Sequence, residues 1–266
     1  MNIFLREWKR NRKSLLIWSI AISFLQFLQV SVYPSFSENL ASTEQFLKAL
    51  PEGLLKAFGM DQLNVGNILE YFGFKAYLLL TLFGGIYAIL LASNMLVKEE
   101  SEKTIEFLLA KPITRTGMIT QKILLVFFNI FLFNLMITSV TYVSFEIYKT
   151  EDYSISIFFL LMTGAFLLHL TFASIGLAIS AFLRKTKTVY PLAIGVIMGT
   201  YFLDVIAKIT DQLEFLKYFS PFRYVDAPDI VLNGQIDSVY IGIMIIIMVF
   251  CLGFSYLYYQ RKDITV

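Results

Sequence analysis

The sequence has few charged residues for its length. Of its 266 residues, 16% are charged and 57% are hydrophobic, whereas soluble domains average about 25% charged residues. A soluble protein of this length would need more polar surface, so the composition indicates a protein whose solvent is lipid. The net charge of only +2, without a basic stripe among aromatic residues, excludes nucleic acid as the expected partner.

Cysteine and histidine are almost missing. Cys251 and His169 are the single residues of their kinds, so neither a disulfide framework nor a Cys- or His-based metal site is expected. No glycine is followed by lysine, which excludes a P-loop and ATP hydrolysis by that route. The sequence therefore predicts no catalytic residue, no metal ligand and no cofactor in this chain.

Long apolar runs make up most of the sequence. A helix needs about 20 apolar residues to cross the core of a bilayer. Six segments have this length: 15–33, 74–96, 118–145, 155–183, 189–207 and 239–258. The sequence thus predicts an all-α, polytopic membrane protein with six transmembrane helices in one transmembrane domain over residues 1–266.

The positive charges indicate the orientation of these helices. Most of the 22 Lys and Arg residues lie near the N-terminus, after the second span, after the fourth span or in the C-terminal tail. With six spans, all of these segments lie on one side of the membrane. Because cytoplasmic segments carry the excess of Lys and Arg, both termini are expected in the cytoplasm.

Two further segments are amphipathic without being long enough to span. Residues 2–13 mix cations with apolar residues, and Trp8 suits headgroup depth, so we expect a helix at the cytoplasmic interface. The external loop, 34–70, has apolar residues at helical spacing over 44–58, which predicts a surface helix broken near Pro51 and Gly53.

One dense group of charges, residues 99–111, follows the second span. Glu99, Glu102, Lys103 and Glu106 share one face of a helix, which Pro112 ends. Another face carries Ile105, Leu108 and Leu109, and apolar residues in a loop exposed to water need a membrane or a partner to cover them. From the residues alone, a helix that merely connects two spans is an equal alternative.

The stretch KEESEKTIEFLLAKPITR (98–115) resembles the first cytoplasmic loop of permease subunits of ATP-binding-cassette (ABC) exporters. The resemblance is to the type-2 export class, with its bacitracin- and sodium-export-like permeases. Residues 175–207, 220–234 and 259–264 are similar to further segments of these permeases, in the same order. The resemblance covers nearly the whole chain, with a gap in the 34–70 loop.

The resemblance implies that 99–111 is a coupling helix that docks into an ATP-binding subunit, and that 2–13 is an elbow helix. It further implies two copies of that subunit, with ATP and Mg bound there, and a second permease subunit, identical or paralogous, in the bacterial plasma membrane. The implied docking residues are Glu99, Glu102, Lys103, Ile105, Glu106, Leu108, Leu109 and Arg115.

In such permeases the second and fifth spans line the transport path. The resemblance therefore implies Thr81, Tyr87, Thr200 and Tyr201 as lining residues. A path lined by apolar and aromatic groups suits a hydrophobic or amphipathic substrate, such as a peptide, a drug or a lipid-like molecule, better than a bare ion.

Small residues at a spacing of four predict close helix contacts. Gly195 and Gly199 form one such pair, and Gly176 and Ser180 form another, for packing within the subunit or at a dimer seam.

Isolated polar residues within the spans also suggest roles. His169 is expected to hydrogen-bond a neighbouring helix, and Asn129 and Asn134 are expected to join helices. Asp204 and Glu146, near the outer ends of their spans, are expected to reach water.

Two other functions stay open from the sequence. A stand-alone secondary transporter or channel would need no ATPase, although the chain lacks the internal repeat usual in such carriers. An intramembrane hydrolase would use Glu99 and Glu100, but residue 104 is Thr where that motif needs Arg.

Overall fold

The computed structural model describes residues 3–39, 49–57, 67–101 and 114–262, and all regular structure in these ranges is helical. Six helical segments are long and apolar enough to cross a membrane, which confirms an all-α protein with six candidate spans. The long helices are α1 (Ile3–Ser31), α6 (Tyr77–Ser93), α9 (Arg115–Tyr148), α10 (Ile155–Phe182), α11 (Thr186–Ile209) and α13 (Ser238–Arg261).

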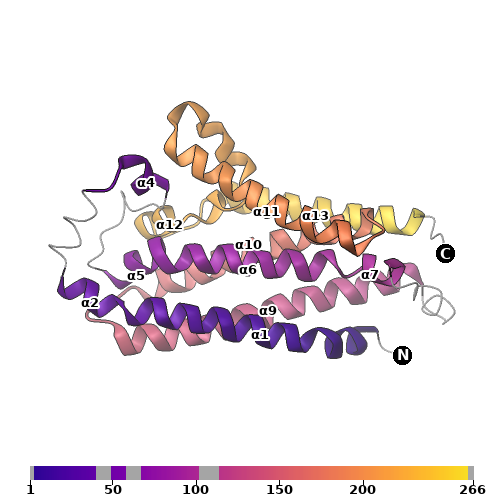
Figure 1. Ribbon diagram of the computed structural model, residues 1–266, viewed down its shortest axis with the longest axis horizontal. Coiled ribbons are helices and arrows are strands. Elements are labelled where there is room, and N and C mark those ends of the chain that lie inside the picture. The colour runs from indigo at the N-terminus through magenta and orange to yellow at the C-terminus, as the bar shows by residue number, and fades with distance from the viewer. Residues whose placement is uncertain (1–2, 40–48, 58–66, 102–113, 263–266) are drawn as a thin grey trace.

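Both termini lie at the same end of the bundle (Figure 1), as an even number of spans requires. We call this the basic end, and the opposite one the far end. The short helix α7 (Val97–Ser101) lies at the basic end. The far end holds α2 (Tyr33–Glu38), α4 (Glu52–Ala57), α5 (Ile68–Tyr71), the π-helix η1 (Phe72–Ala76), the 3-10 helices η2 (Asp211–Phe219) and η3 (Arg223–Val225), and α12 (Ala227–Asn233).

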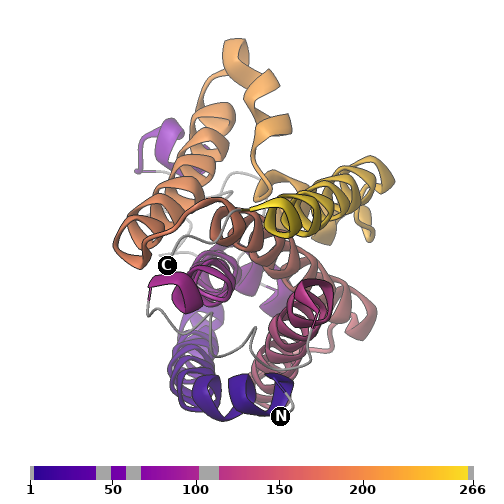
Figure 2. The same cartoon turned by 90° about the vertical axis from the view of Figure 1, so that its right-hand side faces the viewer.

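The long helices form two packed pairs with two flanking helices, which Figure 2 shows end-on. Helix α1 packs along α9, α6 packs along α10, and α11 and α13 flank the opposite side, on α6 and α10 respectively. Helix α10 is central because it contacts α6, α9, α11 and α13. Helices α11 and α13 leave most of their apolar surface uncovered, so these surfaces are available to lipid or to a second subunit.

The closest helix contact is between α6 and α10, at Gly176. A Cβ atom there would lie 2.7 Å from the carbonyl oxygen of Ile89 and 3.0 Å from the Cβ of Ala92. Only glycine lets the two backbones approach this far. The pair of Gly176 and Ser180 therefore packs within the subunit.

The other pair of small residues lies on an open surface of α11. At both Gly195 and Gly199, nothing lies within 4 Å of the position of a Cβ atom. Packing of these two glycines within the described part of the chain is therefore excluded, and a role at a dimer seam stays a prediction.

Two of the expected surface helices take a different form in the structure. Residues 3–13, expected as a separate interfacial helix, are continuous with the first span in α1, although Figure 2 shows their turns crossing the end of the bundle. The rings of Phe4 and Trp8 contact Phe128 of α9. Of the helix expected over 44–58, the described part is α4, which begins directly after Pro51.

Replacing Gly176 with Ala tests the contact between α6 and α10. The added methyl group collides with backbone atoms, so we expect the free energy of unfolding to fall by about 1–3 kcal/mol. Thermal unfolding of the detergent-solubilised protein measures the change. The control is Gly253→Ala in α13, where nothing lies within 4 Å. Equal losses of stability in both variants would contradict the close packing.

Candidate functional site

The described residues that flank 102–113 form a candidate site at the basic end. After α6 ends at Ser93, a short turn leads into α7. The hydroxyl of Ser180 in α10 accepts hydrogen bonds from the backbone N–H groups of Leu96 (2.8 Å) and Val97 (3.1 Å). Because these two donors would otherwise lack partners at the start of a helix, Ser180 holds α7 against α10.

Four charged side chains are buried around α7. Glu7 of α1, Lys98 and Glu99 of α7, and Lys122 of α9 are each at most 3% exposed. Lys98 forms an ion pair with Glu7, and the Lys122 ammonium lies 3.0 Å from the carboxylate of Glu99. Arg6, which is partly exposed, lies 2.7 Å from Glu99 and 3.2 Å from Glu7. We call these five residues the charge network.

Each charge of the network has a partner of opposite sign, as buried charges require. Its two carboxylates face two buried ammonium groups, with the Arg6 guanidinium at the edge. Lys122 also donates to the carbonyl oxygen of Met95 at 2.6 Å. Removing any one partner leaves an uncompensated charge in a medium of low dielectric constant. The network therefore fixes α1, α7 and α9 to one another.

A second group of contacts ties α7 and the start of α9 to the end of α13. Glu100 pairs with Lys262 at 2.9 Å, and the Lys262 ammonium also donates to the carbonyl oxygens of Ala181 and Leu183 at 2.9 Å each. On the other side of 102–113, Arg115 donates to the carbonyl oxygens of Gln260 (3.1 Å) and Lys262 (2.9 Å). Burial lowers the pKa of Lys262, and Glu100 partly opposes this change.

The predicted docking residues divide into two groups. Glu99 faces the cations of its own chain, and its side chain is 1% exposed, so its carboxylate is not at the surface in this structure. Arg115 holds the end of α13. The docking role stays a prediction. The remaining residues lie outside the described part of the chain: Glu102, Lys103, Ile105, Glu106, Leu108 and Leu109.

Sequence reasoning missed the charge network, although two signals pointed to it. Lys122 lies inside the predicted span 118–145, and a cation within a span needs a partner. Glu7 is the single acidic residue among the N-terminal cations. The partners come from helices that are far apart in sequence, which hydrophobic periodicity cannot pair.

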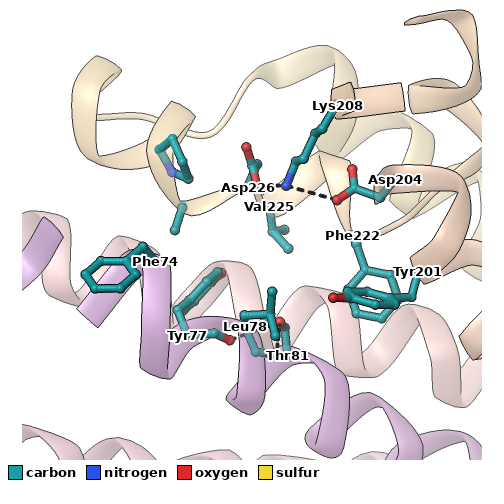
Figure 3. Close-up of a pocket in the computed structure, with 13 residues that line it drawn as sticks. Phe74, Tyr77, Leu78, Thr81, Tyr201, Asp204, Lys208, Phe222, Val225 and Asp226 are labelled. Carbon is teal, nitrogen blue, oxygen red and sulfur yellow. Dashed lines mark hydrogen bonds and ion pairs between the residues drawn. The ribbon is translucent and has the colours of Figure 1, made fainter. Parts of the chain in front are cut away.

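A small polar pocket lies at the far end, between α6, α11 and α12 (Figure 3). Its volume is about 40 Å³, enough for water-sized groups but not for a substrate. Thr81 and Tyr201, two predicted lining residues of the transport path, both line it. The other two do not: Tyr87 is buried with its ring between Trp18 and Phe133, and the Thr200 hydroxyl donates to the carbonyl oxygen of Ile197.

Ion pairs lie along one side of this pocket. The Lys208 ammonium lies 3.0 Å from Asp204 and 2.6 Å from Asp226, as Figure 3 shows. Arg223 then pairs with Asp226 and Asp229 at 2.9 and 3.0 Å. Burial alone would lower the pKa of Arg223, but these carboxylates raise it above its ordinary value, while burial raises the pKa of Asp229.

The environment of Asp204 differs from the prediction. The expectation that Asp204 reaches water is wrong, because its residue is 4% exposed and Lys208 is its partner. Glu146, by contrast, is partly exposed and accepts a hydrogen bond from Tyr153. The difference arises because Asp226, between η3 and α12, pairs with Lys208 beside Asp204, which no local pattern of residues indicates.

His169 joins α10 to its neighbours. Its Nδ1 lies 3.0 Å from Oδ1 of Asn134 in α9, which confirms the expected hydrogen bond between helices. Its ring lies directly against α6, where a Cβ atom at Gly84 would be 2.3 Å from His169 Nε2. Within the described ranges, no group of three or more His, Cys, Asp or Glu residues could hold a metal ion.

Six apolar helices, joined by buried hydrogen bonds and ion pairs, define a multi-pass membrane protein. A sequence model of the family described as "ABC-2 family transporter protein" matches residues 1–264. The chain therefore belongs to this family of ABC transporter membrane proteins, as the resemblance of its motifs predicted, and it is a permease-type transport component. A search of the curated proteins gives no match.

Replacing Lys122 with Met tests the charge network. The change leaves the carboxylates of Glu99 and Glu7 with one buried cation fewer, so we expect the free energy of unfolding to fall by about 3–5 kcal/mol. Glu99→Gln should also destabilise the protein. The double variant should lose less than the sum of the two single losses, because the removed groups are partners. Thermal unfolding in detergent measures each value.

The control for Lys122→Met is Lys149→Met, which removes an exposed Lys from an ion pair with Glu146. Exposed ion pairs contribute little, so the melting temperature should hardly change. Strictly additive losses in the Glu99 and Lys122 variants would show that the two side chains do not interact.

Proposed function

We propose that this chain is the membrane-spanning subunit of an ABC exporter whose ATP is hydrolysed, with Mg, by a separate cassette subunit. The observation that carries this proposal is the anchoring of the described residues on both sides of 102–113. Lys98, Glu99 and Glu100 on one side and Arg115 on the other have partners on α1, on α9 and at the end of α13. A loop that merely connects two spans needs no such anchoring.

The contacts on both sides of 102–113 suit the transmission of force from a cassette subunit to the spanning helices. A cassette subunit that binds residues 102–109 pushes on a segment whose flanks are joined to α1 and α9 by the charge network. The same flanks are joined to α10 and α13 through Lys262 and Arg115. Buried, paired charges keep one geometry, so the push moves packed helices as rigid bodies. We therefore assign Glu99 to the anchor and residues 102–109 to docking.

The assembly that we propose contains two cassette subunits and a second permease subunit, identical or paralogous, in the bacterial plasma membrane. The open surface of α11 at Gly195 and Gly199 supports a contact between permease subunits, since small residues let helices approach closely.

The substrate that we propose is hydrophobic or amphipathic: a peptide, a drug or a lipid-like molecule. Thr81 and Tyr201 are our candidates for the substrate path. In this structure they line the far-end pocket together with aromatic rings, and this pocket would have to widen to admit such a substrate. Tyr87 and Thr200 lie outside this pocket and are weaker candidates.

Two substitutions test the docking role. Leu108→Asp puts a charge where an apolar contact is expected, and Glu102→Lys reverses a charge. We expect each to reduce substrate-stimulated ATPase activity of the reconstituted complex by about tenfold or more, as a lost buried interface contact does, while membrane insertion is unchanged. The matched control is Leu232→Asp, an exposed leucine of α12 at the far end, which should keep its activity.

Normal ATPase activity and complex formation in both variants would show that this segment does not couple the permease to the cassette subunit. Transport by the purified chain in vesicles without ATP or any partner would instead support a secondary transporter or channel.

A further inference from the structure

A groove lies at the basic end, where α10 and α13 finish side by side. Its volume is about 480 Å³. The lining comes from the loop after α10, from the last two turns of α13 and from the residue after α13: Arg184, Phe254, Leu257, Tyr258, Arg261 and Lys262. It is distinct from the charge network, which lies between α1, α7 and α9.

The polar side of this groove is cationic. Arg184 and Arg261 are both exposed. Lys262 is 6% exposed and already bonded to Glu100 and to two carbonyl oxygens of α10. Glu100 is thus paired with Lys262, and two exposed guanidinium groups line the groove beside this pair.

The other side is apolar and continues along the membrane-spanning part of α13. Phe250, Phe254, Leu257 and Arg261 are spaced i, i+4, i+7 and i+11, so they form one stripe that ends in a cation. Phe250 is 73% and Leu257 61% exposed. The stripe is about 16 Å long, or half of the roughly 30 Å hydrocarbon core, which is the depth of one leaflet.

Aromatic rings at the polar end of the stripe also fit this depth. Tyr258 stacks on Phe254 with ring centroids 5.3 Å apart, and Phe182 of α10 contacts Tyr258 at 5.6 Å. Such aromatic residues gather at the level of the lipid headgroups. The groove therefore has headgroup chemistry at one end and acyl-chain chemistry along its length.

We propose that this groove is a binding site for a phospholipid with an anionic headgroup. The headgroup phosphate meets Arg184 and Arg261, and one acyl chain lies along Leu257, Phe254 and Phe250. Guanidinium groups bind phosphate oxygens in a bidentate manner, and basic pockets between membrane helices bind anionic lipids. A partner outside the membrane would not account for the apolar stripe, which runs along a membrane-spanning helix.

The site has a structural consequence. Arg261 and Lys262 are adjacent, and Lys262 holds both Glu100 and the end of α10. A lipid bound across Arg184 and Arg261 therefore stabilises the same junction of α10, α13 and α7 from the membrane side. This inference depends only on the spanning helices and is independent of the proposed coupling to ATP.

Native mass spectrometry of the purified full chain tests the site. The probes are phosphatidylglycerol and phosphatidylcholine with identical acyl chains, and inorganic phosphate as a competitor. We expect wild type to prefer phosphatidylglycerol, and Arg184→Gln/Arg261→Gln to bind it about 30-fold more weakly, since each cation near an anionic lipid contributes a factor of about five.

The matched control is Lys185→Gln/Lys187→Gln, which removes two exposed charges at the start of α11 that do not line the groove. This variant should bind phosphatidylglycerol as wild type does, and both double variants should keep the wild-type melting temperature without lipid. Equal binding of the two lipids by wild type would overturn the proposal. So would undiminished binding by the arginine variant, or displacement by inorganic phosphate at equal concentration.

Discussion

The need to pair buried charge governs the basic end of this protein. The ammonium of Lys122 is fully buried, so its charge needs partners within the protein, and it meets the carboxylate of Glu99 and the carbonyl oxygen of Met95. Glu99 in turn places α7, and α7 places Lys98 opposite Glu7. Because each of these groups would be costly without its partner, three helices hold a single arrangement.

The bundle divides into a tightly packed part and an open part. Helices α6 and α10 are joined by the glycine contact at Gly176 and by the Ser180 cap of α7, and α1 and α9 pack alongside them. Helices α11 and α13 lie at the periphery with most of their apolar surface uncovered. This division suits a transport component, in which rigid groups of helices move relative to one another and to a second subunit.

Local sequence patterns predicted some features well and others poorly, for physical reasons. The six spans follow from length and hydropathy, because every lipid-facing backbone group must be bonded within its own helix. Gly176 and His169 were also found, since small residues and isolated polar groups within a span have few other uses. The burial of Asp204 was not predicted, because Asp226 meets Lys208, the partner of Asp204, only through packing at the far end. The burial of Glu99 was not predicted either, because helical periodicity does not show that Lys122 lies opposite it; its docking role stays a prediction.

The sequence by itself determined that the protein lies in lipid, which segments form the spanning helices, and that their number is even. Hydropathy over about 20 residues is enough for this, because it depends only on neighbouring residues. It also determined the family, through motifs that follow one another along the chain. Tertiary structure alone decided which charges meet: Glu7 with Lys98, Glu99 with Lys122, and Lys208 with Asp226. These partners lie on different elements, and only helix packing brings them within the few ångströms over which ion pairs form.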